Sequence, residues 1–218
     1  MLITFSGLDG AGKSTLIAFL KDSLERDNQS VAVSHMNYDV GMYPMLRSLL
    51  GKRADGQNNH APSEAAFDKK FSTVGAKLRY QLVWNKGLRF LIYPIDVLIF
   101  LVYRFYVERV NQKVLIMDRY FYDTLVDITG ARRTLKTRLL SWLTPTPNLS
   151  IFLDCNPERA FVRKNEYSIE YLNRRRLSYH KLISELPGML VFSTDQDLNV
   201  TQMNLCTAVR QRMVAPCQ

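Results

Sequence analysis

The sequence is poor in cysteine and histidine. Its three cysteines are an odd number with no CxxC pair, and its three histidines, His35, His60 and His180, lie far apart along the chain. A structural zinc site needs ligands at short spacings, and a disulfide framework needs paired cysteines. We therefore expect neither feature, and we expect a reducing, cytoplasmic location.

The sequence also lacks a long uninterrupted apolar run. Residues 2–5, near the start, carry no signal-peptide pattern, so we expect no export. The most apolar stretch, FLIYPIDVLIFLVY at residues 90–103, is interrupted by Pro94 and Asp96 and is too short to span a membrane comfortably. We expect no transmembrane span, but a helix buried against a sheet or in a dimer interface, with shallow membrane contact as the alternative.

The composition is that of a globular chain. With 218 residues, 47% hydrophobic and 22% charged, it predicts one compact domain over residues 1–218 rather than a disordered or fibrous protein. A folded chain of this size buries roughly 70% of the surface that its unfolded form exposes, so its stability requires no metal or disulfide.

Basic residues exceed acidic ones by nine, and most of the excess lies in one block. Residues 130–181 hold eleven basic and four acidic side chains, so this block carries a net charge of +7 out of the total of +9. Such an excess indicates contact with phosphates, in nucleic acid, membrane headgroups or a small phosphorylated ligand.

Short apolar runs alternate with longer helical patterns. Because fully apolar strands need cover on both faces, the pattern predicts an α/β fold with a parallel sheet between two layers of helices. The predicted strands are residues 2–6, 31–34, 114–117, 149–153 and 189–192.

Two helix starts are well marked. Asn156 can cap a helix that has Pro157 in its first turn, and Ser168 can cap the run 169–185. In the first of these helices Arg159 and Arg163 are four residues apart, so we expect them to share a face and to be able to reach one anion.

The strongest motif is GLDGAGKS at residues 7–14, which fits the phosphate-binding loop pattern. It follows an apolar strand and enters a helical pattern, the context in which backbone N–H groups surround phosphate oxygens. We expect Lys13 to reach the β- and γ-phosphates of a nucleoside triphosphate and Ser14 to ligate Mg²⁺. The nucleotide-binding residues predicted here are Gly7, Asp9, Gly10, Ala11, Gly12, Lys13, Ser14 and Thr15.

Three further residues extend the predicted site beyond the loop. A carboxylate beside polyphosphate is repulsive, so Asp9 suggests an acceptor hydroxyl or the metal's water shell, unless it turns to solvent. Asp118 follows an apolar strand and suits Mg²⁺, while the guanidinium of Arg119 suits a phosphoryl group. A structural Asp–Arg pair is the alternative reading.

Four segments carry a resemblance to the thymidylate kinase family of nucleoside monophosphate kinases, over most of the chain. They are FSGLDGAGKSTL at 5–16, VLIMDRY at 114–120, PTPNLSIFLDCNPERAFVRK at 145–164 and EYLNRRRLSYHKL at 170–182, and residues 191–195 are similar to the family's adenine-contacting turn. The resemblance implies a three-layer P-loop fold with five parallel strands in the order 2-3-1-4-5, ATP as phosphoryl donor, Mg²⁺ as cofactor and often a homodimer.

The same resemblance implies roles for individual residues. Lys13 and Ser14 would take the donor-phosphate and metal roles, Asp9 the acceptor-sugar role, Asp118 the metal-water role and Arg119 the acceptor-phosphate role. It also implies an acceptor-binding helical segment at about 40–112 and a lid at about 156–176. Further residues implied are Arg159, Arg163 and Lys164 in the lid, Arg176 and Tyr179 in the helix after it, and Thr194 at the adenine.

The acceptor side departs from the family's pattern. Residues 34–39, SHMNYD, replace the family's Arg-Glu-Pro-Gly-Gly-type turn, and the nearest base-stacking candidates are at 67–71 and 79–80. Both acceptor chemistries therefore stay open: a phosphate needs cationic clamping, whereas an alcohol benefits from a carboxylate base. Arg119, Arg132 and Arg133 favour a phosphate, and Asp9, Asp39 and Asp123 would serve an alcohol.

The leading hypothesis is thus an ATP-dependent kinase, thymidylate kinase-like, that phosphorylates a nucleoside monophosphate such as dTMP. One alternative is a P-loop kinase of a non-nucleotide alcohol, such as a sugar or lipid headgroup. Another is a nucleotide-dependent switch, because residues 127–130 imitate a GTPase motif, although residues 85–88 lack the acid that would read guanine. No nucleic-acid module is visible, so we expect no nucleic-acid partner.

Overall fold

The computed structural model describes residues 1–36, 39–41, 86–129, 135–186 and 188–214. Several predictions lie outside these ranges: the base-stacking candidates at 67–71 and 79–80, Arg132 and Arg133, and much of the expected acceptor-binding segment.

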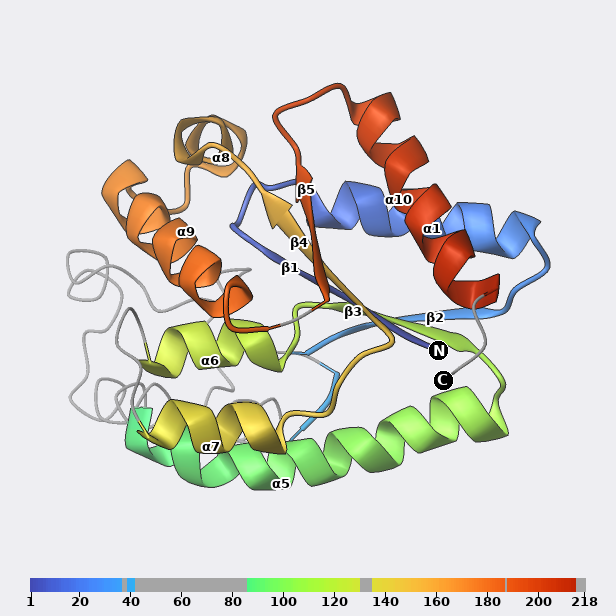
Figure 1. Ribbon diagram of the computed structural model, residues 1–218, viewed down its shortest axis with the longest axis horizontal. Coiled ribbons are helices and arrows are strands. Elements are labelled where there is room, and N and C mark those ends of the chain that lie inside the picture. The colour runs from blue at the N-terminus through green and yellow to red at the C-terminus, as the bar shows by residue number, and fades with distance from the viewer. Residues whose placement is uncertain (37–38, 42–85, 130–134, 187, 215–218) are drawn as a thin grey trace, which may run out of the picture.

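A five-stranded sheet forms the centre of the protein (Figure 1). All neighbouring strands are parallel and their order is β2-β3-β1-β4-β5, which confirms the predicted topology. Each strand also matches a predicted apolar run to within one residue. The strands are β1 Leu2–Gly7, β2 Val31–His35, β3 Val114–Asp118, β4 Leu149–Asp154 and β5 Met189–Ser193.

Helices cover both faces of the sheet. Helices α1 and α10 contact each other on one face, while α5, α6 and α7 pack together on the other (Figure 1). The helical elements are α1 Lys13–Arg26, α5 Lys86–Phe105, the π-helical turn η1 Tyr106–Val110, α6 Phe121–Thr129, α7 Leu135–Leu143, α8 Pro157–Lys164, α9 Ile169–Ile183 and α10 Leu198–Val214.

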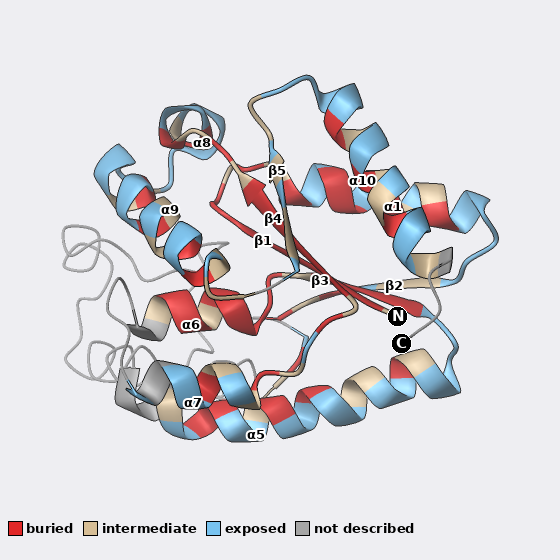
Figure 2. Ribbon diagram, viewed as in Figure 1, coloured by how far each residue is buried: buried red, intermediate tan, exposed pale blue. Residues whose placement is uncertain are grey.

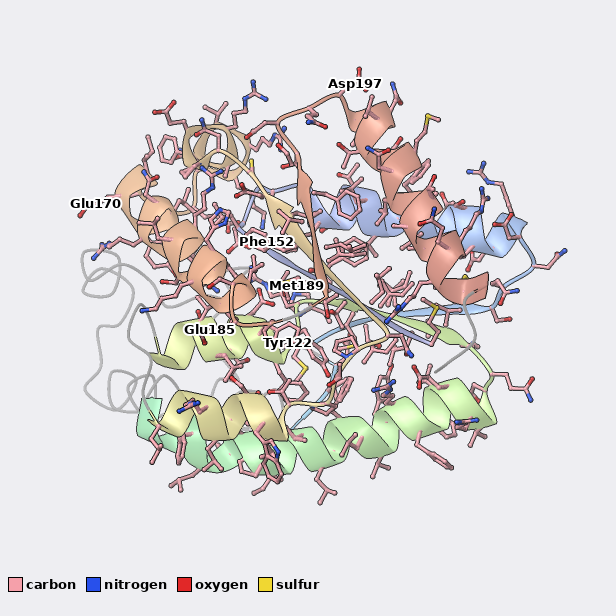
Figure 3. All side chains as sticks on the ribbon, in the orientation of Figure 1. Tyr122, Phe152, Glu170, Glu185, Met189 and Asp197 are labelled. Atoms are coloured by element: carbon pink, nitrogen blue, oxygen red, sulfur yellow. The ribbon has the colours of Figure 1, made fainter. Side chains whose placement is uncertain are left out.

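Burial follows this layering. The three central strands are buried along almost their whole length, whereas the edge strands β2 and β5 are partly exposed (Figure 2). Tyr122 of α6 and Phe152 of β4 are both buried and lie between the layers (Figure 3). The core therefore supports the β1–β3–β4 centre, which carries the glycine loop.

Both predicted helix caps are present. The Asn156 side chain accepts a hydrogen bond from the Glu158 N–H at 2.9 Å, and the Ser168 hydroxyl accepts one from the Tyr171 N–H at 3.3 Å. Helix α9 ends at Ile183, two residues before the predicted end.

Helix α5 is buried on one side only, and the prediction of a dimer interface on its other side stays untested. One side packs on the core through Tyr93, Val97 and Phe100, and Phe100 makes edge-to-face contacts with Tyr120 and Phe121 at 5.5 and 5.4 Å between ring centroids. The opposite side is exposed, because α6 and α7 contact only one side of the helix. By length and composition alone, one helical stretch among the described residues could cross a membrane: it runs from Phe90 to Val110, has a mean hydropathy of 1.8 and is 28% buried.

Replacing Phe100 by alanine tests how strongly α5 is anchored. Phe100 is fully buried, so Phe100→Ala is expected to lower the free energy of unfolding by about 3–5 kcal/mol. Val102→Ala, on the exposed side of the same helix, should change it by less than about 0.5 kcal/mol. Urea unfolding of the two variants measures the difference, and equal effects would contradict the packing described.

Candidate active site

The loop after β1 turns directly into α1. Gly10 and Gly12 have φ values of 87° and 85°, in the left-handed region that glycine adopts without strain. Gly12 is the N-cap of α1, and no side chain among the described residues caps this end. The first N–H groups of α1 therefore have no side-chain partner, which suits an anion at this helix N-terminus.

Helix α8 lies directly against this loop. A Cβ atom on Gly10 would come within 2.5 Å of the Ala160 carbonyl oxygen, so only glycine fits there. Arg163 of α8 donates a hydrogen bond to the Gly10 carbonyl at 3.2 Å. One predicted lid residue is thus beside the predicted phosphate-binding loop.

The Lys13 side chain is buried beneath the loop. Its ammonium group donates hydrogen bonds to the carbonyl oxygens of Gly7 and Leu8, at 2.9 and 2.8 Å. Burial, and then the nearby charge of Arg119, lower the pKa of Lys13 to about 8. Ser14 and Thr15, the next two residues, are exposed at the start of α1.

Arg119 joins the end of β3 to the loop. Strand β3 pairs with β1, with Asp118 opposite Phe5, so the residue after it reaches the loop. The Arg119 guanidinium donates to the Asp9 carboxylate and lies 3.7 Å from an Asp123 oxygen. Burial acts to lower the pKa of Arg119, but Asp9 and Asp123 outweigh it and hold the pKa above its usual value.

The burial of Asp9 and its pairing with Arg119 decide between two readings of these residues. Asp9 is 7% exposed, so the reading in which it turns to solvent is wrong. Arg119 does form an ion pair with an aspartate, and this aspartate is Asp9 of the glycine loop. Arg119 also has a φ of +66°, a left-handed conformation that is strained for a residue with a side chain.

Asp118 offers an oxygen that fits a metal site. Its Oδ1 atom is buried and has no hydrogen-bond partner among the described residues. An orphaned carboxylate oxygen on the strand next to β1, together with the exposed Ser14 hydroxyl, suits Mg²⁺, which prefers oxygen ligands. No group of three or more His, Cys, Asp or Glu side chains gathers in the described part of the chain. Mg²⁺ here would therefore take further ligands from water and a bound nucleotide.

Asp123 is a buried hydrogen-bond acceptor rather than a free base. It accepts hydrogen bonds from the Ser6 hydroxyl at 2.7 Å, the Tyr120 N–H at 3.0 Å and the Tyr179 hydroxyl at 2.6 Å. It thus ties β1, α6 and α9 together behind Arg119. Asp39, another candidate base, is exposed and accepts from the His35 N–H at 2.6 Å, which stabilises the turn after β2.

Sequence reasoning missed Arg175. This residue is 7% exposed and donates hydrogen bonds to Asp127 at 2.6 Å and to the Tyr171 hydroxyl at 2.9 Å. Its guanidinium also lies 5.6 Å from the centre of the Tyr179 ring. The signal was present as a four-residue spacing of Tyr171, Arg175 and Tyr179 on one helix face. Asp127, the first residue of the GTPase-like stretch, is therefore paired with Arg175.

His35 was also missed as a neighbour of the site. It ends β2 and lies opposite Asp118 in the sheet. Burial, more than any charge, lowers the pKa of His35.

The two arginines of α8 do not converge on one point. Arg159 donates to the Asp195 carbonyl at 2.8 Å, in the turn after β5, whereas Arg163 reaches the loop. Thr194 in that turn bonds to the Asp154 carbonyl through its N–H at 2.9 Å. Each arginine has a separate backbone acceptor here, and the expectation that both can reach one anion stays a prediction.

Helix α9 is fixed to the end of β4. Arg176 binds Asp154 with two hydrogen bonds of 2.6 Å. Burial acts to raise the pKa of Asp154, but the hydrogen bonds and charge of Arg176 hold it below its usual value. Lys164, the last of the lid candidates, pairs with Glu166 at 3.3 Å.

The sheet order and the glycine loop between β1 and α1 define the α/β fold of a P-loop kinase. A comparison with protein-family models found no match. Among curated proteins, the chain is 23% identical to the thymidylate kinase of Legionella pneumophila (strain Paris), covering 96% of this chain and 94% of that protein.

Two further relatives carry similar names. The thymidylate kinase of Thermoanaerobacter sp. (strain X514) is 24% identical, with 87% of each chain covered. The probable thymidylate kinase of Methanosphaera stadtmanae is 28% identical, with 84% of each chain covered. The chain is thus similar to thymidylate kinases over most of its length.

The lowered pKa of Lys13 predicts a pH-dependent stability. In the unfolded chain the lysine keeps its proton up to its ordinary pKa of 10.5, whereas in the folded protein it releases the proton above about 8. Between about pH 8 and pH 10.5 the unfolded state binds more protons than the folded state, so the free energy of unfolding rises with pH. Below about pH 8 the buried Lys13 is charged in the folded protein, and the whole cost of burying that charge lowers the stability. Across this pH window the free energy of unfolding of the wild type should rise by about 1–3 kcal/mol relative to that of Lys13→Met.

Urea unfolding at several pH values from about 7 to 10.5 measures this difference. Lys21→Met, which removes a 43% exposed lysine from the same helix, is the matched control and should show no such gain. Parallel stability profiles for the wild type and Lys13→Met would contradict the burial of a charged Lys13.

Proposed function

We propose that this protein is an ATP-dependent phosphotransferase of the thymidylate kinase type, which moves the γ-phosphoryl group of ATP to a nucleoside monophosphate such as dTMP. One observation carries the proposal: the glycine loop and the Asp118–Arg119 strand end lie side by side, joined by the Asp9–Arg119 ion pair. The similarity to curated thymidylate kinases supports a nucleotide kinase function.

On the donor side, the N–H groups of residues 10–15 and the Lys13 ammonium would bind the ATP phosphates. Lys13 would exchange its two backbone carbonyl acceptors for phosphate oxygens. Ser14 and Asp118 would hold Mg²⁺, which neutralises phosphate charge when bound. The turn at Thr194, tied to the end of β4, would contact the adenine.

On the acceptor side, Arg119 would hold the acceptor phosphate. Its planar guanidinium can bind two phosphate oxygens at once, and Asp123 behind it fixes its orientation. The acceptor phosphate would replace Asp9 as the partner of Arg119, which would free the Asp9 carboxylate for an acceptor hydroxyl. This chain departs from the family's acceptor motifs. Residues outside those motifs would therefore contact the base and the sugar of the acceptor.

The chemistry that follows is alignment and charge neutralisation. A monophosphate acceptor is already an anion at neutral pH, so it attacks without a general base. Lys13, Arg119 and Arg163 would surround the transferred group with positive charge, and the lid at about 156–176 would exclude water. Arg163 already contacts the loop through Gly10.

A second acceptor class has its own support. Asp9, Asp118 and Asp123 place three carboxylates around Lys13 and Arg119, so groups that can accept a proton lie within the site. An alcohol would lose a proton to Asp9 as it attacks. The alternative function is therefore a P-loop kinase of a non-nucleotide alcohol. The switch hypothesis has no such support, because Asp127 is bound by Arg175.

A variant of the loop lysine tests the phosphotransferase itself. Lys13→Ala should lower the turnover number at least about a hundredfold while leaving the circular dichroism spectrum unchanged. ADP release with dTMP, dUMP and a panel of alcohols measures both turnover and acceptor class. Lys21→Ala on the same helix is the control, and wild-type turnover by Lys13→Ala would refute the mechanism.

A variant of Arg119 tests whether this residue binds the acceptor and not ATP. Arg119→Lys keeps the charge but loses the two-pronged geometry, so the KM for a monophosphate acceptor should rise about tenfold or more. The KM for ATP should stay within about twofold. Steady-state kinetics with each substrate varied gives both constants, and a rise in the KM for ATP alone would overturn this assignment.

Three expectations remain predictions: a homodimer, a cytoplasmic location and the absence of a nucleic-acid partner. A single domain over residues 1–218 is likewise proposed, with the acceptor-binding segment at about 40–112 in the same unit. They accompany the proposed function and do not support it.

A further inference from the structure

The side of α9 that packs on α6 carries three polar side chains spaced four residues apart, Tyr171, Arg175 and Tyr179. Helices α6 and α9 lie side by side (Figure 1). A four-residue spacing brings side chains together on one face of a helix. Arg175 is 7% exposed and Tyr179 is 1% exposed, so the second half of this face is closed to solvent.

Arg175 is the centre of this face, and an arginine can only donate hydrogen bonds. Besides its bonds to Asp127 and Tyr171, it donates one to the Tyr179 hydroxyl at 3.4 Å. Its Nε atom is buried and has no hydrogen-bond partner in the described part of the chain. A buried donor without a partner costs stability, so this position of the guanidinium is not the one that serves the fold best.

The direction of the hydrogen bonds that lead away from Arg175 is fixed. Because Arg175 cannot accept, the Tyr179 oxygen accepts from it and the Tyr179 proton points to the Oδ1 atom of Asp123, at 2.6 Å. Burial raises the pKa of Tyr179 well above its usual value, so the hydroxyl keeps this proton. The same Oδ1 atom lies 3.7 Å from the Arg119 guanidinium. These contacts, here called the α9 relay, run from Arg175 through Tyr179 and Asp123 to Arg119.

We propose that Arg175 is a positioning residue for the acceptor substrate. Through the Tyr179 hydroxyl it would hold the Asp123 carboxylate in place, and that carboxylate would orient the guanidinium of Arg119. This inference rests on the proposed function, because it takes Arg119 as the group that binds the acceptor phosphate.

The relay matters most when an acceptor phosphate binds. In the structure Arg119 lies between the carboxylates of Asp9 and Asp123. In the proposed mechanism the phosphate takes the place of Asp9, and Asp123 then remains to orient Arg119. The Oδ2 atom of Asp123 is held from β1 and from the residue before α6, whereas its Oδ1 atom, which faces Arg119, accepts from Tyr179. The α9 relay therefore acts on the oxygen that matters for the acceptor.

A simpler explanation of Arg175 is an ion pair with Asp127 that only joins α9 to α6. The two explanations differ in what happens when both charges are removed together. Joint replacement of a buried ion pair by neutral side chains of similar size is often neutral for stability. A purely structural pair would therefore be replaced without consequence for the kinetics, whereas loss of the relay would still weaken acceptor binding.

Steady-state kinetics on the full chain, with ATP and then dTMP or dUMP varied, tests the inference. The double variant Arg175→Met, Asp127→Asn should raise the KM for the monophosphate about fivefold or more and keep the KM for ATP within about twofold. Asp127→Asn alone leaves the contact between Arg175 and Tyr179 and should keep both constants within about twofold. Arg174→Met, at an exposed position on the same helix, is the matched control.

Tyr179→Phe tests the relay at its middle. This change keeps the buried ring and removes only the hydroxyl, so the KM for the monophosphate should again rise about fivefold or more. Adding Arg175→Met and Asp127→Asn to Tyr179→Phe should then change that constant by less than about twofold, because the route to Asp123 is already broken. Effects that multiply would contradict the relay.

The possible outcomes separate this inference from the proposed function. If the wild type transfers no phosphoryl group to any monophosphate, both are refuted. If the wild type is active, the role of Arg175 alone is refuted by a double variant with the acceptor KM of the wild type, or by an equal rise in Asp127→Asn. A wild-type acceptor KM in Tyr179→Phe would refute it as well, even if the double variant does not fold in urea-unfolding measurements.

Discussion

The buried ion cluster of Asp9, Arg119 and Asp123 is the interaction on which the site depends. Arg119 is 4% exposed and has carboxylates on two sides, one from the glycine loop and one from α6. Removing Arg119 would leave both buried carboxylates without this cation, at a cost of about 3–5 kcal/mol. The cluster therefore fixes the end of β3 against the loop, and the donor and acceptor halves of the proposed site share it.

A second layer of contacts holds that cluster in place. Asp123 is bound by Ser6 and Tyr179, and Tyr179 lies beside Arg175, which in turn binds Asp127. These contacts tie β1 to the start of α6, and α9 to its start and to its second half. The loop also meets α8, both through the Arg163 side chain and through a close backbone approach of Gly10 to Ala160 that leaves no room for a Cβ atom on Gly10. The site thus rests on charge on one side and on close backbone contact on the other.

The sequence predicted the features that depend on local order. Strand positions follow from apolar runs, and the caps at Asn156 and Ser168 need only the first turn of their own helices. It did not predict the bond between Ser6 and Asp123, whose residues are 117 positions apart, or the pairing of Arg175 with Asp127. Such partners depend on how helices pack, which one sequence does not specify.

The apolar helix illustrates the same limit. Its composition predicted a helix, but apolar residues alone do not tell which side the core will contact. In the described part of the helix, Tyr93, Val97 and Phe100 meet the core, while the nearby Val102 faces outward. The exposed side became visible only when the packing of α5 on Tyr120 and Phe121 was known.

The backbone at Arg119 has a consequence for how relatives of this protein are compared. Its left-handed conformation is unfavourable, yet its side chain neutralises two buried acids. A descendant that had lost its enzymatic role would still be stabilised by this arginine, because its loss would leave two buried carboxylates without this cation. Retention of an arginine here is therefore weak evidence that a relative is an active enzyme, and an inactive one could keep the whole Asp-Arg-Tyr triplet.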